Sequence, residues 1–207
     1  MHLYRGRYYL FGTCRAEGMH RATQIFVSDT PDGEFLPLSP EARTPYNWEC
    51  LDGTLWIEDG VPYMVFCREW LEVKDGEMWA MPLADDLTHP VGEPVLLFRA
   101  SQATDVREHG KEGSGDYITD GPFLYREGDT LRMIWSSFGG KDGETGRYLV
   151  LDAVSEGGVC GPWKHLGSRY DFDGGHAMLF KTLTGEEMIA LHSPNVRGPE
   201  RAKFFRF

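Results

Sequence analysis

The sequence has few cysteines, no long apolar run and no recognisable targeting segment. Its four cysteines are Cys14, Cys50, Cys67 and Cys160, and no two of them form a CxxC pair. This spacing argues against a zinc clip or a dense disulfide framework and favours free thiols. No window approaches the roughly 20 apolar residues that a membrane-spanning helix needs. No charged-then-apolar leader precedes the first strand pattern, which predicts a cytoplasmic location.

Basic residues are also scarce: 21 Lys and Arg stand against 32 Asp and Glu, for a formal net charge of −11. Nucleic-acid binding needs clustered positive charge, so no nucleic-acid partner is expected. The lack of apolar spans likewise predicts no membrane partner. Hydrophobic residues make up 41% of the 207 residues and aromatic residues 13%, which indicates a globular chain with a sizeable core.

Helical periodicity is nearly missing, whereas short apolar runs bounded by turns occur throughout. The 25 Gly and 12 Pro are spread along the chain, as is typical of an all-β protein. A hairpin pattern followed by a third strand recurs four times, and the first three repeats add a fourth, outer strand. The repeats cover roughly residues 1–40, 50–100, 118–166 and 174–207.

Four such repeats predict an all-β chain with about four blades of a β-propeller, in a single domain over residues 1–207. The inner strands are apolar on both faces, as stacked blades require. A β-sandwich is the alternative architecture, although it would not need the same hairpin register four times. Negligible helix is expected.

Three polar residues precede or open successive hairpins. Asp52 precedes the second hairpin, Asp120 precedes the third, and His176 opens the fourth. Because blade repetition brings the start of each inner strand near the propeller axis, we expect these side chains to face one axial cavity from equivalent positions. Asp and Gly are also common turn residues, so turn chemistry alone explains any single one of them.

Seven short motifs lie in the order found in glycoside hydrolase family 43, and the sequence resembles that family over nearly its whole length. They are LDGTL (51–55), YMVFCREW (63–70), TDGPFL (119–124), WSSF (135–138), GPW (161–163), GGHAMLF (174–180) and LHSPN (191–195). The resemblance implies a five-bladed propeller of the arabinosidase and xylosidase type. It implies a hydrolase of O-glycosyl bonds in arabinose- or xylose-containing oligosaccharides or polysaccharides such as arabinan and xylan, with an inverting mechanism.

The resemblance also implies site roles, since the family uses a general base, a tuning Asp and a general acid. Asp52 looks like the tuning residue. Asp120 sits where the acid belongs, but most members carry Glu there, so its carboxyl is withdrawn by one methylene. Glu69 is the alternative proton donor, or else a solvated loop charge. His176 resembles an axial histidine near bound calcium or water, which makes it the candidate metal-site residue and Ca²⁺ near the axis the candidate cofactor.

The resemblance further implies that the family's first blade, which carries the catalytic base, is absent. Asp29 and Asp32 precede Asp52 but belong to a turn at the outer edge. Hydrolysis by the isolated chain is therefore expected to be weak or absent. The alternative is a non-catalytic carbohydrate-binding or structural propeller remnant. A third possibility, a propeller that serves protein–protein interaction, is supported only by analogy of fold.

Aromatic side chains that stack on sugar faces are the expected substrate contacts. Trp48 and Trp70 are expected on loops that flank the cavity, and Phe138, His192 and Arg197 are the other substrate-binding candidates.

Four blades with five-blade curvature would leave a gap and exposed apolar faces. We therefore expect either self-association across the gap or a tightened four-blade closure. The side chains expected to meet water are Leu10, Phe11, Ile25, Val27, Phe180, Ile189, Phe204, Phe205 and Phe207.

Overall fold

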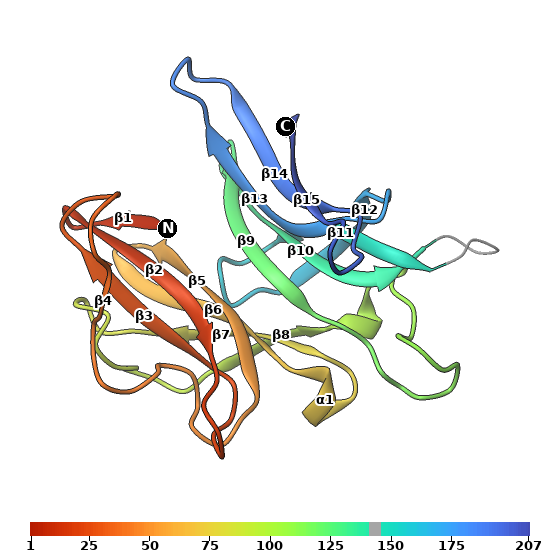
Figure 1. The fold of residues 1–207 in the computed structure, drawn as a ribbon, viewed down its shortest axis with the longest axis horizontal. Helices are drawn as coiled ribbons and strands as arrows, with labels where there is room; N and C mark the ends of the chain where they lie inside the picture. The colour runs from red at the N-terminus through yellow and green to blue at the C-terminus, as the bar shows by residue number, and fades with distance from the viewer. Residues whose placement is uncertain (141–145) are drawn as a thin grey trace.

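The structure is a computed structural model that describes residues 1–140 and 146–207, and the regular secondary structure of these residues is almost entirely β-strand (Figure 1). They form four antiparallel sheets arranged as propeller blades, which confirms the all-β prediction. The helical elements within the described ranges are the short helix α1 (Trp70–Val73) and the 3₁₀ turn η1 (Ala100–Gln102). No helix there is long and apolar enough to span a membrane.

Each blade follows the chain in order from its inner to its outer strand. The first two blades consist of β1 (His2–Tyr4), β2 (Arg7–Cys14), β3 (Ala22–Ser28) and β4 (Leu36–Pro37), then β5 (Cys50–Glu58), β6 (Val61–Arg68), β7 (Glu77–Pro82) and β8 (Val95–Arg99). The last two consist of β9 (Asp120–Glu127), β10 (Thr130–Gly139), β11 (Arg147–Ser155) and β12 (Trp163–Tyr170), then β13 (Gly175–Lys181), β14 (Glu187–Ser193) and β15 (Arg201–Arg206).

Tight turns set the register of the hairpins. Arg5 and Gly6 join β1 to β2, and both have positive φ, at 47° and 79°. Asp59 and Gly60 join β5 to β6 in the same way, at 50° and 83°. Two successive left-handed residues make the type I′ turn, whose twist matches that of the paired strands. These dipeptides therefore align the inner two strands of the first and second blades.

The core lies between the blades, because the strands are buried on both faces. In β6, Met64 and Phe66 pack with residues of the first blade, while Val65 and Cys67 pack with residues of the third. This alternation follows the two-residue period of a strand. A third cluster, around Ile134, joins the third blade to the fourth. Stacking of the blades thus accounts for inner strands that are apolar on both faces.

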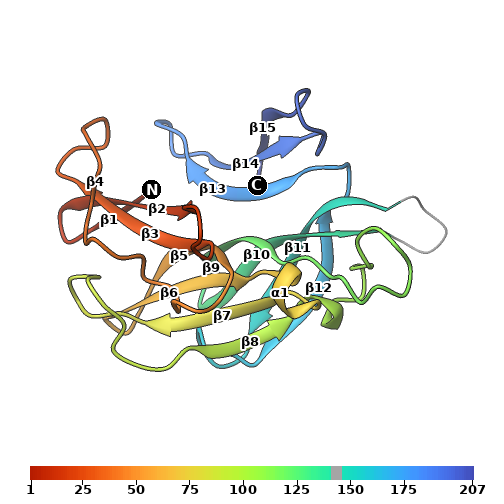
Figure 2. The ribbon, with the colours of Figure 1, turned by 60° about the horizontal axis from the view of Figure 1, so that its bottom comes forward.

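The propeller is open between its first and last blades (Figure 2). A cleft of about 410 Å³ lies there, lined by residues of β1, β2 and β13, by residues 52–54 of β5 and by residues 121–123 of β9. The predicted tightened closure is therefore not seen. Leu10, Phe204 and Phe205 are exposed, as predicted.

Three of the side chains that were expected to meet water are buried instead. Ile25 and Val27 pack against the second blade, and Ile189 packs against the third. The prediction was wrong for these residues because each of them faces a neighbouring blade rather than the open side.

Candidate active site

The inner strands of the second, third and fourth blades begin with the same irregularity. Each pairing with the next strand shifts register at a β-bulge. One residue in each bulge has left-handed backbone geometry: Asp52 (φ 55°), Gly121 (φ 52°) and His176 (φ 49°). Left-handed φ is costly for most residues, and Gly and Asp accept it best. The bulges re-aim the side chains at the strand entries.

The positions of the bulges show that the three polar residues are not all at equivalent positions of their blades. Asp52 and His176 occupy matching positions, but the matching residue of the third blade is Gly121. Asp120 is the last paired residue before its bulge, opposite Ser136, and is therefore displaced by one position. The prediction of three equivalent positions was wrong by one residue for Asp120, because the glycine after it takes the left-handed conformation.

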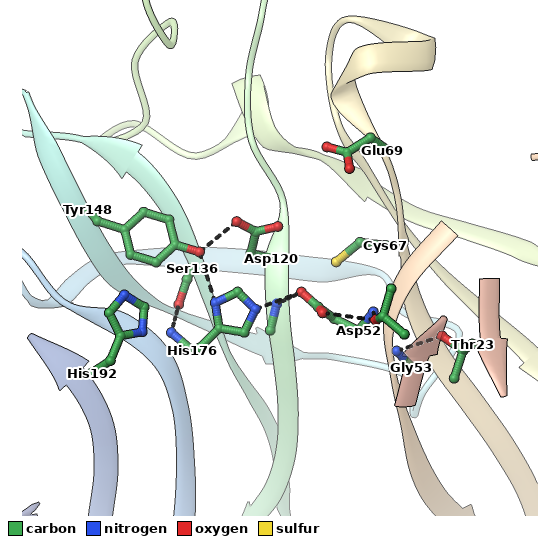
Figure 3. Close-up of polar contacts among 12 residues, drawn as sticks. Thr23, Asp52, Gly53, Cys67, Glu69, Asp120, Ser136, Tyr148, His176 and His192 are labelled. Atoms are coloured by element: carbon green, nitrogen blue, oxygen red, sulfur yellow. Dashed lines mark hydrogen bonds and ion pairs between the residues drawn. The ribbon is translucent and has the colours of Figure 1, made fainter. Parts of the chain in front are cut away.

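The structure nevertheless brings Asp52, Asp120 and His176 together (Figure 3). One ligand-type atom from each residue lies within 4.8 Å of the other two. His176 Nε2 lies 2.8 Å from Asp52 Oδ2. The hydroxyl of Tyr148 donates to Asp120 Oδ2 at 2.6 Å and lies 3.2 Å from His176 Nδ1. Two carboxyls and an imidazole thus form one hydrogen-bonded cluster beside the cleft.

Asp52 is held as a carboxylate. Burial raises its pKa, but the hydrogen bond and charge of His176 and the amide of Gly121, which donates to Oδ2 at 2.9 Å, outweigh burial and lower the pKa below its usual value. Burial also lowers the pKa of His176, and the Asp52 carboxylate more than offsets it, so the His176 pKa is raised. Asp52 and His176 therefore form an ion pair within the cluster.

Asp120 has the opposite tendency. Burial raises its pKa, the charge of His176 opposes this, and the nearby Asp52 carboxylate raises it further. The hydrogen bond from Tyr148 only partly offsets these effects, so the Asp120 pKa stays above its usual value. Two carboxyls whose environments move their pKa values apart are the usual arrangement of an acid and its charged partner.

Glu69 is buried, at 4% exposure, so its interpretation as a solvated loop charge was wrong. It directly precedes α1, and its carboxylate pairs with Arg21. Burial raises the Glu69 pKa, and Asp120 and Asp52 add to this, while Arg21 opposes it. The buried thiol of Cys67 is affected by the same three carboxyls, and burial together with their charges raises its pKa. Glu69 therefore belongs to the same electrostatic cluster.

Three of the five predicted substrate-binding side chains lie in aromatic groups near the cluster. His109 contacts both Trp70 and Phe138, with ring centroids 5.5 Å and 5.2 Å apart. The ring of His192 stacks on Tyr148 at 5.7 Å. Its Nε2 lies 2.8 Å from the side-chain oxygen of Asn195.

The other two candidates lie apart from these groups. The guanidinium of Arg68 covers the Trp48 ring at 4.2 Å, and Trp79 packs against the same ring at 4.8 Å. These contacts occupy ring surface that a sugar would need. Arg197 is exposed on the loop between β14 and β15.

The residues do not fit direct binding of the predicted Ca²⁺. Calcium takes six to eight oxygen ligands. Among the described residues, the metal-type cluster offers two carboxylates and one imidazole, and both nitrogens of His176 are already engaged with Asp52 and Tyr148. We therefore interpret His176 as a hydrogen-bonding residue and derive no step through a metal.

Sequence reasoning missed Tyr148 and Arg21. Tyr148 lies within the apolar pattern of β11, where an aromatic residue suggests only core packing. Arg21 reaches Glu69 across 48 positions of the sequence, a contact that no local pattern signals.

Comparison with known proteins agrees with this fold. Residues 1–205 match the sequence profile of Glycosyl hydrolases family 43. An endo-arabinase from Bacteroides thetaiotaomicron VPI-5482 is 47% identical, with a TM-score of 0.91 over 99% of this chain and 72% of that one. Curated protein sequences give no significant match.

Two more distant structures support the fold alone. A thermostable family-43 glycoside hydrolase is 20% identical, with a TM-score of 0.73 over 99% of this chain and 69% of that one. An α-L-arabinanase from Cellvibrio cellulosa, solved with arabinohexaose, is 17% identical, with a TM-score of 0.64 over 99% and 71%. The fold and the family profile define a propeller of the glycoside hydrolase class. The chain belongs to Glycosyl hydrolases family 43.

Proposed function

We propose that the cluster is the site of glycosidic bond hydrolysis in arabinose- or xylose-containing oligosaccharides, with inversion at the anomeric carbon. Asp120 is the general acid, and Asp52 is the ionised carboxylate that tunes it. The observation that carries the proposal is the close placement of two half-buried carboxyls, with ligand-type atoms within 4.8 Å, of which Asp120 has a raised pKa and Asp52 a lowered one. The arabinase similarity supports the substrate class.

In this proposal the leaving oxygen takes the Asp120 proton while water attacks the opposite face of the sugar. Inverting hydrolysis needs a base about 6.5–9.5 Å from the acid, with room for the water. Among the described carboxylates of the cluster, Asp52 is paired with His176 and Glu69 with Arg21. We therefore place the base outside this cluster. The rate of hydrolysis by the chain alone is expected to be lower than that of an enzyme with a general base, by the factor of about 10²–10⁴ that such a base supplies.

Because Asp52 and Glu69 are held in ion pairs and neither is free to activate water, a second candidate function is glycan binding without turnover. In that case the cleft and the aromatic groups around His109 and Tyr148 would hold the oligosaccharide, and no bond would be cleaved. Binding measured by calorimetry, with no product after prolonged incubation, would support this candidate over the first.

The test of the first candidate is hydrolysis of aryl arabinosides and xylosides with good and poor leaving groups. An acid matters most for a poor leaving group, so Asp120→Asn should lose about 10²–10⁴-fold on that substrate and much less on the activated one. Asp129→Asn, at an exposed turn, is the matched control. If Glu69→Gln shows the leaving-group dependence and Asp120→Asn does not, Glu69 is the proton donor and the assignment of Asp120 is wrong.

A further inference from the structure

A continuous chain of hydrogen bonds joins Asp120 to Asp52 through Tyr148 and His176. The Tyr148 hydroxyl lies 2.6 Å from Asp120 Oδ2 and 3.2 Å from His176 Nδ1. His176 Nε2 then lies 2.8 Å from Asp52 Oδ2 (Figure 3). The chain therefore connects the proposed acid to the proposed tuning residue through two intervening side chains.

The proton positions along this chain follow from the donor inventory of each group. A phenol has one proton, and Tyr148 donates it to Asp120 Oδ2. Its oxygen is then free to accept a hydrogen bond from the Nδ1–H of His176. Because Asp52 is an acceptor at Nε2, both nitrogens of His176 carry protons, and the imidazolium lies between Tyr148 and Asp52. Every link is then a satisfied donor–acceptor pair.

Tyr148 is fixed firmly enough to hold this geometry. It is buried, at 4% exposure, and its ring lies close to those of both His176 and His192. Its backbone amide donates to Asp173 Oδ1 at 3.2 Å. Gly175 leaves the space that the ring occupies, since a Cβ there would lie 2.1 Å from Tyr148 Cε1. The hydroxyl is therefore aimed at Asp120 by packing and not only by its own hydrogen bonds.

We propose that Tyr148 is a positioning residue through which Asp52 acts on Asp120 by way of His176. This inference rests on the proposed function, because it explains how the tuning carboxylate reaches the acid. It also gives the shorter Asp120 side chain a fixed partner where most family members carry the longer Glu.

The proposal predicts a dependence on Tyr148 that direct electrostatics does not. Through space, loss of the Asp52 charge removes a repulsion that raises the Asp120 pKa, but it also neutralises His176, whose charge lowers that pKa, and neither effect needs Tyr148. Acting through the chain, Asp52 keeps His176 protonated, and the imidazolium strengthens the bond from Tyr148 to ionised Asp120. Loss of Asp52 would then neutralise His176, weaken that bond and raise the Asp120 pKa.

The test is a carboxyl ¹³C NMR titration of the full chain, labelled at aspartate. The Asp120 resonance is identified by its absence in Asp120→Asn. The Asp120 pKa is measured with and without Asp52→Asn in two backgrounds, wild type and Tyr148→Phe. Tyr125→Phe, on β9 of the same sheet, is the matched control. The readout needs no turnover, so an inactive chain would count against the proposed function without bearing on this inference.

We expect Asp52→Asn to raise the Asp120 pKa in the wild-type and Tyr125→Phe backgrounds, and to raise it less than half as much, or to lower it, in Tyr148→Phe. His176→Asn breaks the chain of hydrogen bonds at a second point and should have the same effect as Tyr148→Phe. Asn is chosen because it tolerates the left-handed backbone at this position. An equal upward shift in all backgrounds, or a downward shift in wild type, would overturn the proposal. Circular dichroism of each variant verifies the fold.

Discussion

Replacing Gly175 by alanine should strain the site from behind Tyr148. The added Cβ would lie 2.1 Å and 2.4 Å from two carbons of the Tyr148 ring and 2.9 Å from Ser136 Oγ. Real Cβ atoms essentially never approach so closely, and both neighbours are buried. The ring must therefore move, which pulls its hydroxyl away from Asp120. Overpacking of this kind costs about 1–3 kcal/mol.

Gly12→Ala is the matched control, since Gly12 lies in β2 and its Cβ would meet only the edge of the half-buried Phe26 ring, at 3.3 Å, which needs to move by only a few tenths of an ångström. Reduced freedom of the unfolded chain contributes about 0.4–1 kcal/mol in favour of such a variant and offsets this small adjustment. Urea unfolding should therefore separate the two variants clearly. Each kcal/mol corresponds to about 2–4 °C in Tm for a chain of this size. Equal stability of Gly175→Ala and Gly12→Ala would refute the packing argument.

Three further outcomes are expected. First, the His176 pKa is raised above 6.5, so the stability that the charged His176 contributes is fully present below pH 6.5 and is lost as the pH rises through the raised value. The difference in unfolding free energy between wild type and His176→Asn should therefore be larger at about pH 6 than at about pH 9. The reverse order would contradict the ion pair. Treatment with EDTA and re-addition of Ca²⁺ should leave the Tm unchanged, whereas a clear rise with Ca²⁺ would show that the cluster or another site binds the metal. Exposed Leu10 and Met178 line the cleft, so light scattering should show a dimer, and a strictly monomeric chain would contradict self-association.

The blades were predictable because local signals define them. Turn dipeptides such as Asp59-Gly60 fix the hairpins, and the two-residue period of β6 shows a strand buried on both faces. The position of Asp120 relative to its bulge was not predictable, since Asp52-Gly53 and Asp120-Gly121 read alike. In the first pair Asp takes the left-handed conformation, and in the second Gly does.

The site was only partly predictable for a related reason. Asp52 and His176 mark strand entries, and blade symmetry alone brings strand entries together. Tyr148 reaches them from β11, the third strand of its blade, where nothing distinguishes it from a core aromatic residue. The burial of Glu69 depends on Arg21 from the preceding blade, so its loop position pointed wrongly to solvent.

The central claim is that a glycan binds at the cluster of Asp52, Asp120 and His176. The most direct test is amide NMR of the chain during titration with arabino- and xylo-oligosaccharides. The account predicts that the resonances of Asp52, Gly121 and His176 shift in a saturable way with at least one of the two sugars. A second cleft, of about 560 Å³, is lined by residues of the third and fourth blades that include Arg126 and Lys181. Shifts confined to that second cleft, or no shift with either sugar at millimolar concentration, would contradict the account.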